Sequence, residues 1–409
     1  MKNTLIKYLP WLFILIMIEP SFQRSTLPIF PAVVTFTFHT LFVILAITIW
    51  NEGRFPYSHL LNILMLWIFI CIIRGIFVSG NYWEYKSLYR YSLALLSSLG
   101  ILVFMSPYRV IHCLRMYFKY IVPISVVALP FFHTWSWFWM YYVFFVMIIF
   151  YPIIYRKNLF LAITIFFTFI DVTARSIFIK VIMALGLSQL TRVSAHLKDY
   201  VYKILGYGLY ILTLCLLILG LSGVFNVFDM KSYMPNAIAK NKELSQDTRT
   251  WLYREAITSA IVNDYVIMGR TPAKGYDSNY NKLKDDIRER SRISGDNVQD
   301  LNMERNAEVF FLNVFTWTGL IGVVLFSLMF LMATHIALKT ARNDFVKIIG
   351  VYVAFRFMYG WVEETFTFNG NILCLWLVVG ICYSPHFRAM TNREIAKFFR
   401  HAILLPYVR

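Results

Sequence analysis

A succession of long apolar stretches constrains this chain more than any other feature of its sequence. A helix that crosses a membrane needs about 20 predominantly apolar residues, and such stretches recur along most of the 409 residues. Charged residues make up only 15% of the chain, whereas soluble proteins average about 25%. We therefore predict an all-α polytopic membrane protein with about 12 transmembrane helices. The predicted spans are residues 8–19, 28–50, 59–79, 88–106, 117–133, 136–154, 158–171, 175–190, 203–223, 309–334, 345–361 and 366–383. The short stretches on either side of Asp171 can also be read as one broken hairpin.

The chain divides into four parts. They are the N-terminal spans (1–223), one long polar loop (224–308), the C-terminal spans (309–383) and a basic tail (384–409). Lys and Arg concentrate in that tail and in the short loops 106–119, 155–158, 191–203 and 337–347. Because loops rich in Lys and Arg stay in the cytoplasm, we expect both termini in the cytoplasm and the long loop outside. The first apolar stretch lacks a small-residue cleavage site, so we expect an uncleaved anchor.

The net charge of +17 does not indicate a nucleic-acid partner. The long loop holds 13 Lys and Arg and 13 Asp and Glu, so the whole excess lies elsewhere in the chain. That excess follows from membrane topology and from attraction to anionic lipid. The long loop also contains none of the five cysteines, so we expect no disulfide framework, thiolate metal site or catalytic Cys there.

One segment of the long loop has the pattern of an amphipathic helix. Apolar residues recur at helical spacing between 248 and 264, from Trp251 to Ile261. We expect this helix to lie on or near the membrane surface, with Asp247 or Thr248 as its N-cap.

Charged residues occur where a membrane disfavours them, and most fall at the same predicted face. A charge at the centre of a membrane helix costs about 2.5 to 3.5 kcal/mol or more, so charges at these places need a reason. The residues are Arg175, Arg249, Arg254, Arg305, Glu308, Arg356, Glu363 and Glu364. Together they predict a site for an anionic headgroup, because Arg binds phosphate bidentately and stays charged. The alternative for each Arg is an interfacial anchor, and Glu363 and Glu364 can instead pair with Arg356. Arg74 and Lys180 lie inside predicted spans and can snorkel or pair within the bundle.

Three local patterns make the chain resemble a known family. The first is an Arg at an outside turn between spans, Arg175 in "DVTARSIFI". The second is Arg249 opening the loop helix, which ends near Gly269. The third is a polar residue, an apolar run and Gly-Leu-Ile-Gly, which here begin with Glu308. With the many spans and the long late loop, these patterns resemble the bacterial O-antigen polymerase and O-antigen ligase superfamily of integral-membrane glycosyltransferases.

The resemblance implies a GT-C-like enzyme of the bacterial inner membrane that uses undecaprenyl-pyrophosphate-linked glycans as donor and acceptor. The long loop would be periplasmic, and a chain-length regulator and a flippase would be further partners. Ligases of this superfamily carry a His where Glu308 stands, and residues 224–308 contain no His, which favours a polymerase.

In that interpretation Glu308, Arg249 and Arg175 are catalytic, and Arg175, Arg249, Arg254 and Arg305 bind the pyrophosphate. Glu308 is the candidate base, and a structural ion pair is its alternative role. Arg356, Glu363 and Glu364 are secondary candidates. The sequence shows no nucleotide-binding fingerprint and no carboxylate cluster that needs a metal, so we expect neither cofactor nor metal.

Three other functions stay open. A ligase would share the fold and the donor but transfer the glycan to the lipid A core. A transporter of polysaccharide or lipid-linked substrate would line its path with Arg74, Lys180 and Arg356, although the internal repeats common in transporters are not visible. A non-catalytic scaffold of an envelope assembly would use the charge-dense loop for docking.

Overall fold

The computed structural model shows a helical bundle, and the residues it describes are 2–23, 32–50, 58–128, 137–154, 156–169, 175–222, 249–278, 303–304 and 306–402. Nearly all of them are helical. Within these ranges the β structure is one antiparallel pair of two-residue strands, β1 (Tyr276–Asp277) and β2 (Met303–Glu304). Among the described residues, four helices are long and apolar enough to cross a membrane. The chain is therefore an all-α membrane protein.

In the described residues up to Ser222, the chain forms ten α-helices and three short 3₁₀ segments that extend or follow them. The α-helices are α1 (Lys2–Gln23), α2 (Ala32–Ile49), α3 (Ser58–Val78), α4 (Tyr82–Leu96), α5 (Gly100–Phe104), α6 (Pro107–Ala128), α7 (Trp137–Met147), α8 (Lys157–Phe169), α9 (Arg175–Gln189) and α10 (Ala195–Leu221). The second half contributes α13 (Thr250–Val262), α16 (Phe310–Thr340), α17 (Asp344–Gly360), α18 (Gly370–Tyr383), α19 (Pro385–Ala389) and α20 (Asn392–Ala402).

The predicted number of twelve spans is not confirmed. The four helices that meet the length and hydropathy of a span are Ser58–Val78, Tyr82–Phe104, His196–Gly220 and Phe310–Thr340. Shorter apolar helices cover Val34–Ile49, Tyr141–Ile153, Lys157–Phe169 and Gly370–Tyr383. About 20 residues are needed for an upright crossing, so these shorter helices do not reach the length of a full span within the described residues.

The predicted loop 106–119 is a correction to the sequence analysis, because α6 already begins at Pro107. Proline is favoured at the first position of a helix, where its missing N–H removes no hydrogen bond. The first turns of α6 bury Val110, Cys113 and Leu114 while Tyr108 and Arg115 stay exposed. Basic residues on the exposed side of an amphipathic helix were thus mistaken for a loop.

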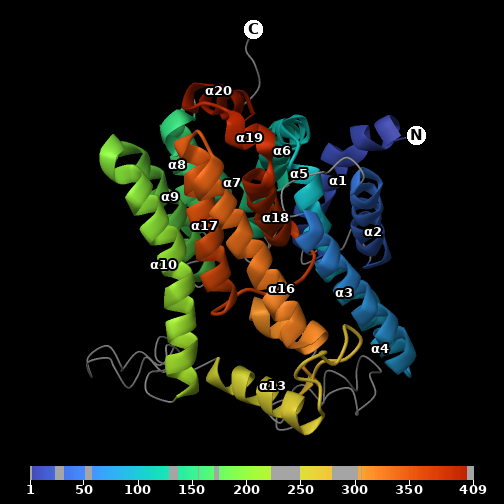
Figure 1. The fold of residues 1–409 in the computed structure, drawn as a ribbon. Coiled ribbons are helices and arrows are strands. Elements are labelled where there is room, and N and C mark those ends of the chain that lie inside the picture. Colours follow the sequence, from blue (N-terminus) through green and yellow to red (C-terminus); the bar gives the residue numbers. More distant parts are fainter. Residues whose placement is uncertain are drawn as a thin grey trace.

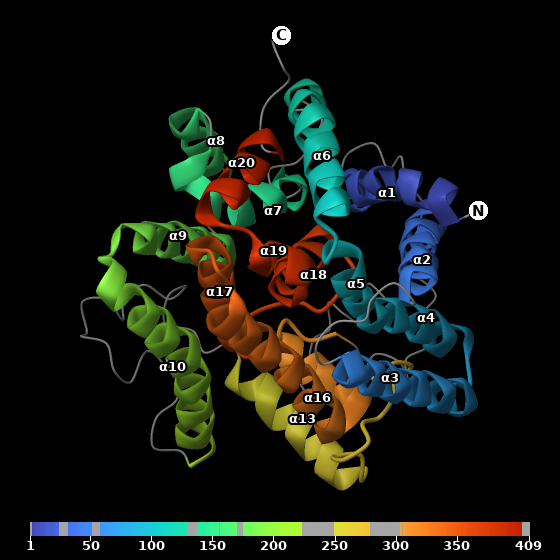
Figure 2. The same ribbon diagram turned by 45° about the horizontal axis from the view of Figure 1, so that its top comes forward.

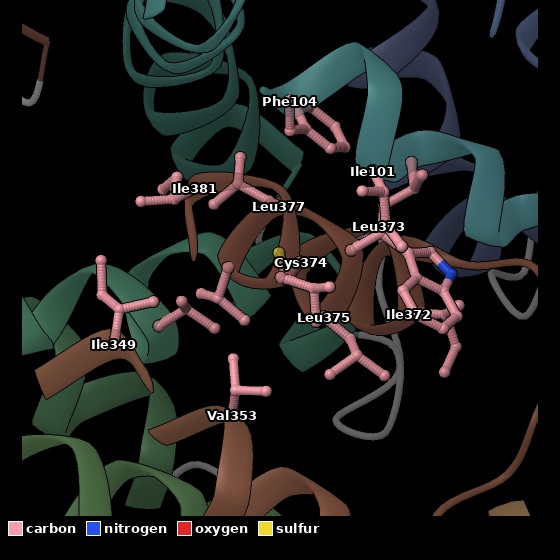
Figure 3. Packing of buried hydrophobic residues seen from close by; sticks show 14 of the residues in the cluster. Ile101, Phe104, Ile349, Val353, Ile372, Leu373, Cys374, Leu375, Leu377 and Ile381 are labelled. Atoms are coloured by element: carbon pink, nitrogen blue, oxygen red, sulfur yellow. The ribbon is translucent and has the colours of Figure 1, made fainter. Parts of the chain in front are cut away.

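Helix α18 forms the centre of the bundle. All of its residues are buried, and Figure 2 shows it in the middle of a ring of other helices. Leu373, Leu377 and Ile381 of α18 pack near Ile101 and Phe104 of α5, as Figure 3 shows. The hydrophobic core therefore surrounds α18, and the apolar outer faces of peripheral helices such as α3 and α10 point away from it.

Helix α16 is broken at Gly319, and a segment that follows α13 fills the break. Gly319 has φ 69° and ψ −170°, which are not helical. The Leu320 amide donates to the Val266 carbonyl at 2.9 Å, and the Arg270 amide donates to the Thr316 carbonyl at 2.7 Å. Backbone groups that a broken helix would leave unpaired in the membrane are thereby satisfied.

Two glycines make this close approach feasible. A Cβ on Gly319 would lie 2.1 Å from the Ile267 carbonyl oxygen, and one on Gly269 would lie 2.4 Å from the Gly319 nitrogen. Both residues also have positive φ, which glycine adopts without strain. Gly319 and Gly269 thus join the loop containing α13 to the membrane helices.

Candidate functional site

Helix α13 lies across the start of α16 at one end of the bundle (Figure 1). Its apolar face buries Leu252 and Ala256 against Val309 and Leu312. The expected helix in the long loop is present, but the expected cap is wrong: Arg249 occupies the N-cap position and makes no side-chain capping bond. The amphipathic pattern predicted the position of the helix. It could not predict the N-cap, because the Arg249 side chain pairs with Glu308 instead of capping the helix.

The start of α16 holds Glu308 in a fixed backbone. The Asn313 side chain accepts a hydrogen bond from the Ala307 amide and donates one to the Ala307 carbonyl, both at 2.7 Å. The Glu308 carbonyl accepts a hydrogen bond of 2.8 Å from the Glu364 amide. Glu308 is thus tied on one side to its own helix and on the other to the turn between α17 and α18.

Arg249, Glu308 and Glu363 form what we call the exposed cluster. Arg249 Nη1 lies 2.7 Å from Glu308 Oε2, and Arg249 Nη2 lies 3.8 Å from Glu363 Oε1. The Glu308 side chain is 65% exposed and that of Glu363 is 40% exposed, whereas that of Arg249 is 15% exposed. A guanidinium held between two solvent-facing carboxylates can exchange either of them for another anion, because ion pairs in contact with water are weak.

Lys180, Arg356, Glu364 and Asn371 form a second group, the buried cluster. Glu364 Oε1 lies 3.2 Å from Lys180 Nζ and also accepts hydrogen bonds from Arg356 and Asn371. Arg356 Nη2 donates to Asn371 Oδ1 at 3.2 Å. Burial acts to raise the pKa of the Glu364 carboxyl, but Arg356 and Lys180 outweigh it and hold that pKa below its usual range. The Glu364 carboxylate therefore pairs with two buried basic side chains at once.

The backbone of Arg175 lies at the same end of the molecule as these two clusters. Lys198, in the first turn of α10 and so beyond the end of α9, pairs with Asp344 at the start of α17 at 3.1 Å. Lys180, near the start of α9, reaches Glu364 beyond the end of α17. Helices α9 and α17 are therefore antiparallel, and Arg175, the first residue of α9, lies further toward the α13 end than Lys180. The Arg175 side chain lies outside the described part of the chain.

Arg254, another of the predicted phosphate-binding residues, is not brought into the exposed cluster. Arg254 lines a groove of about 680 Å³ along α13, together with Thr250, Glu255 and Asn263. Arg305 lies outside the described residues. Of the secondary candidates, Glu363 belongs to the exposed cluster, and Arg356 and Glu364 belong to the buried one.

Several residues that support the site were missed or left unassigned by sequence reasoning. Arg74 donates to the carbonyls of Met268 and Gly269 at 2.8 and 3.2 Å, and Trp67 Nε1 donates to the Thr318 carbonyl at 2.9 Å. Arg74 therefore has a structural role at the break in α16, consistent with pairing inside the bundle. Its position inside an apolar stretch was the signal that it needed a partner.

Two further polar side chains, Tyr253 and Asn371, connect the elements that carry the two clusters. Tyr253, one turn after Arg249, donates a hydrogen bond to the Trp361 carbonyl, which joins α13 to the turn carrying Glu363. Asn371, at the start of α18, bonds with Arg356 and Glu364 of the buried cluster, and no sequence pattern indicated this role. No three His, Cys, Asp or Glu side chains gather into a candidate metal site within the described ranges.

Comparison of the chain with known protein families, curated proteins and solved structures found no match.

Proposed function

We propose that this protein is a bacterial surface-polysaccharide polymerase that joins undecaprenyl-pyrophosphate-linked repeat units. The observation that carries the proposal is the contact between Arg249 and Glu308. These two residues, 59 positions apart, were selected from sequence as phosphate ligand and base, and their side chains are 2.7 Å apart beside the end of the membrane bundle. Two further observations support the proposal. The carboxylates of the exposed cluster face solvent, and α13, which Arg249 precedes, packs on the start of α16, which Glu308 precedes.

In the proposed reaction, a hydroxyl of the incoming unit attacks the anomeric carbon of the growing chain. A new carbon–oxygen bond forms as the bond from that carbon to the lipid pyrophosphate breaks, and the electron pair leaves with the pyrophosphate. Glu308 takes the hydroxyl proton, and Arg249 stabilises the charge that develops on the leaving group. Fixed cations of this kind stabilise a developing anion because they need no reorganisation during the reaction.

The exposed cluster has two carboxylates and one cation, so a pyrophosphate needs further positive charge. We assign that role to Arg175, whose backbone begins α9 at this end, and to Arg254 and Arg305. Binding would release Arg249 from at least one carboxylate, which leaves Glu308 free to accept a proton. Arg356 and Glu364 then have a positioning role. Arg356 pairs with the Glu364 side chain, and the Glu364 amide donates a hydrogen bond to the Glu308 carbonyl.

The proposed reaction requires a membrane location and lipid-linked substrates. The protein would lie in the bacterial inner membrane with both termini in the cytoplasm and residues 224–308 in the periplasm. Its substrates would be undecaprenyl-pyrophosphate-linked glycans, with a chain-length regulator and a flippase as partners. No cofactor and no nucleic acid enter the reaction as we propose it.

A transporter is a second candidate, because discontinuous helices are common at transporter binding sites and α16 is discontinuous at Gly319. In transporters the broken backbone typically faces substrate or ions. Here the Val266 carbonyl and the Arg270 amide pair with groups of the broken helix. The break therefore serves to attach the loop, which favours the polymerase.

The test is complementation of a gene deletion in the native host, read as the length distribution of the surface glycan on a gel. We expect wild type and Lys339→Gln, an exposed residue at the far end of α16, to restore a ladder of chain lengths. We expect Arg249→Gln and Glu308→Gln at matched membrane levels to leave a single repeat unit on the acceptor. Long chains retained on the lipid carrier would indicate a ligase, and an unchanged ladder in the deletion strain would contradict both enzymes.

A further inference from the structure

Helices α6, α19 and α20 lie at the end of the bundle opposite α13 (Figure 1). A cavity of about 970 Å³ lies between the start of α6 and helices α19 and α20. Helix α16 spans 31 residues, or about 46 Å at 1.5 Å per residue. Its first residues contact α13, and its last ones contact α19, where the Arg342 amide donates to the Arg388 carbonyl at 2.9 Å. This cavity is therefore far from the exposed cluster and takes no part in the chemistry proposed there.

Cationic side chains from two helices line this cavity. Its described lining includes Arg109 and Arg115 from α6 and Lys397 from α20, against Glu394 as the one carboxylate in that lining. The N-terminus of α6 also forms part of the wall, at Pro107 and Tyr108, and a helix N-terminus carries a partial positive charge. The net positive charge favours an anionic ligand.

Glu394 offsets only part of this positive charge, and its carboxylate oxygen is already engaged in capping α20. Its carboxylate accepts hydrogen bonds from the Thr391 amide at 2.7 Å and from the Thr391 hydroxyl at 3.0 Å. These bonds hold the pKa of Glu394 below its usual range. The reciprocal arrangement is a capping box, so Glu394 has a structural role.

Apolar side chains also line the cavity, among them Ile49, Leu102, Met105, Ile111 and Phe398. The rest of the described lining is Ser106, Pro385, His386, Ala389 and Met390. Helix α20 lies over the end of the bundle with Ile395 and Phe399 buried and Arg393, Lys397 and Arg400 exposed, as a helix at a membrane surface does. A ligand with a charged headgroup and an apolar body fits such a lining better than a free inorganic anion.

A second, smaller cavity continues the basic surface around α6. Its volume is about 460 Å³, and it shares Ser106, Tyr108 and Arg109 with the first while adding Lys7 and His112. Burial and the nearby Arg115 lower the pKa of His112, so Lys7 and Arg109 supply the charge there. Cationic side chains thus face both sides of the start of α6.

We propose that the cavity between α6 and α20 binds a phosphate group, and that the headgroup of an anionic phospholipid supplies it. Arg109, Arg115 and Lys397 would contact the phosphate, and the apolar side chains of the lining would contact the first carbons of the acyl chains. Basic pockets between membrane helices bind anionic headgroups for this reason.

The experiment measures lipid binding to the purified full-length protein in a neutral detergent. Native mass spectrometry would follow titration with phosphatidylglycerol, with phosphatidylcholine and with inorganic phosphate alone. The test variant is Arg115→Gln/Lys397→Gln. The matched control is Arg393→Gln/Arg400→Gln, which removes two charges from α20 at positions that do not line the cavity. Arg115→Lys/Lys397→Arg keeps the charge and reports on damage to the fold.

We expect saturable binding of phosphatidylglycerol that is about tenfold weaker or worse in the test variant, given about 1 kcal/mol for each basic residue at a lipid surface. The control and the charge-retaining variant should stay within about threefold of wild type. Equal weakening in test and control variants would overturn the proposal in favour of general surface electrostatics. Saturable binding of inorganic phosphate without any preference for phosphatidylglycerol would overturn the lipid as the source.

Discussion

Glu363 and Glu364 are neighbours in the chain, yet they belong to two clusters with opposite properties. Glu363 lies in the exposed cluster, where one Arg serves two solvent-facing carboxylates. Glu364 lies in the buried cluster, where one carboxylate serves two cations and side chains are about 1% to 6% exposed. Glutamate–arginine pairs thus occur in both clusters. In the exposed cluster the partners can exchange with other ions, and in the buried cluster they cannot.

The difference follows from the cost of removing a charge from water. Losing one partner of a buried ion pair leaves an uncompensated charge and destabilises a protein by about 3–5 kcal/mol. An exposed pair contributes only about 0–1 kcal/mol, because water replaces the lost partner. The buried cluster therefore positions the site, and the exposed cluster is suited to bind and release a substrate.

The largest effect should come from Glu364→Gln. It removes the charge that balances Lys180 and Arg356, so we expect about 3–5 kcal/mol of destabilisation and little folded protein in the membrane. Thermal unfolding of the detergent-solubilised protein measures this, with Glu363→Gln as the matched control. A melting temperature equal to that of wild type would show that the buried cluster does not hold the structure.

Glu308→Gln should affect activity without affecting stability. Loss of a general base typically lowers the rate by about 10²–10⁴-fold, whereas loss of an exposed ion pair changes stability by about 1 kcal/mol or less. The rate of polymerisation and the melting temperature should be measured on the same preparation. If both fall together, Glu308 is structural, as in the alternative that the sequence left open.

Glu363→Gln should have a smaller effect. Glu363 is 3.8 Å from Arg249 and 40% exposed, so its removal should change stability by less than about 1 kcal/mol. It also frees Arg249 from one competing carboxylate, so we expect equal or tighter binding of a prenyl pyrophosphate. A titration of that ligand against wild type and Glu363→Gln decides this, and weaker binding by the variant would argue that Glu363 contacts substrate.

The smallest effect concerns Asp277, which belongs to a third carboxylate–arginine pair near α13. Burial acts to raise the pKa of Asp277, but Arg270, 2.8 Å away, and hydrogen bonds from Asn263 and Ser259 leave it below the usual value. A lowered folded-state pKa stabilises the protein above the unfolded value of about 3.9 and loses that contribution as pH falls through the folded pKa. The melting temperature of wild type should thus fall more than that of Asp277→Asn below about pH 4. Parallel curves would mean that the pair contributes nothing.

The sequence predicted the helical membrane class and the helix carrying Arg249, because both follow from hydropathy and periodicity. Arg249 and Glu308 were assigned from sequence to one expected site, but their direct contact was not predicted. The separation of Glu363 from Glu364 could not be predicted, because it depends on the conformation of one turn after α17. The number of spans stays a prediction, since a run of apolar residues does not show whether a helix is buried inside the bundle, as α18 is.

The break in α16 illustrates the same limit at a single residue. Gly319 was noticed as part of Gly-Leu-Ile-Gly, but only its positive φ and its contact with Ile267 show why a side chain is excluded there. Gly269, 50 positions earlier, has the matching role. A pattern in one segment cannot identify its partner in another.

The most direct test of the central claim is turnover by the purified protein in liposomes with undecaprenyl-pyrophosphate-linked repeat units. Release of undecaprenyl pyrophosphate would be measured for wild type, Arg249→Gln and the distant control Lys339→Gln. Loss of one group that stabilises a developing anion typically slows a reaction by about 10²–10³-fold. We predict that slowing for Arg249→Gln with an unchanged melting temperature, and a rate within about twofold of wild type for Lys339→Gln. Turnover by Arg249→Gln at the wild-type rate would contradict the assignment of the exposed cluster as the active site.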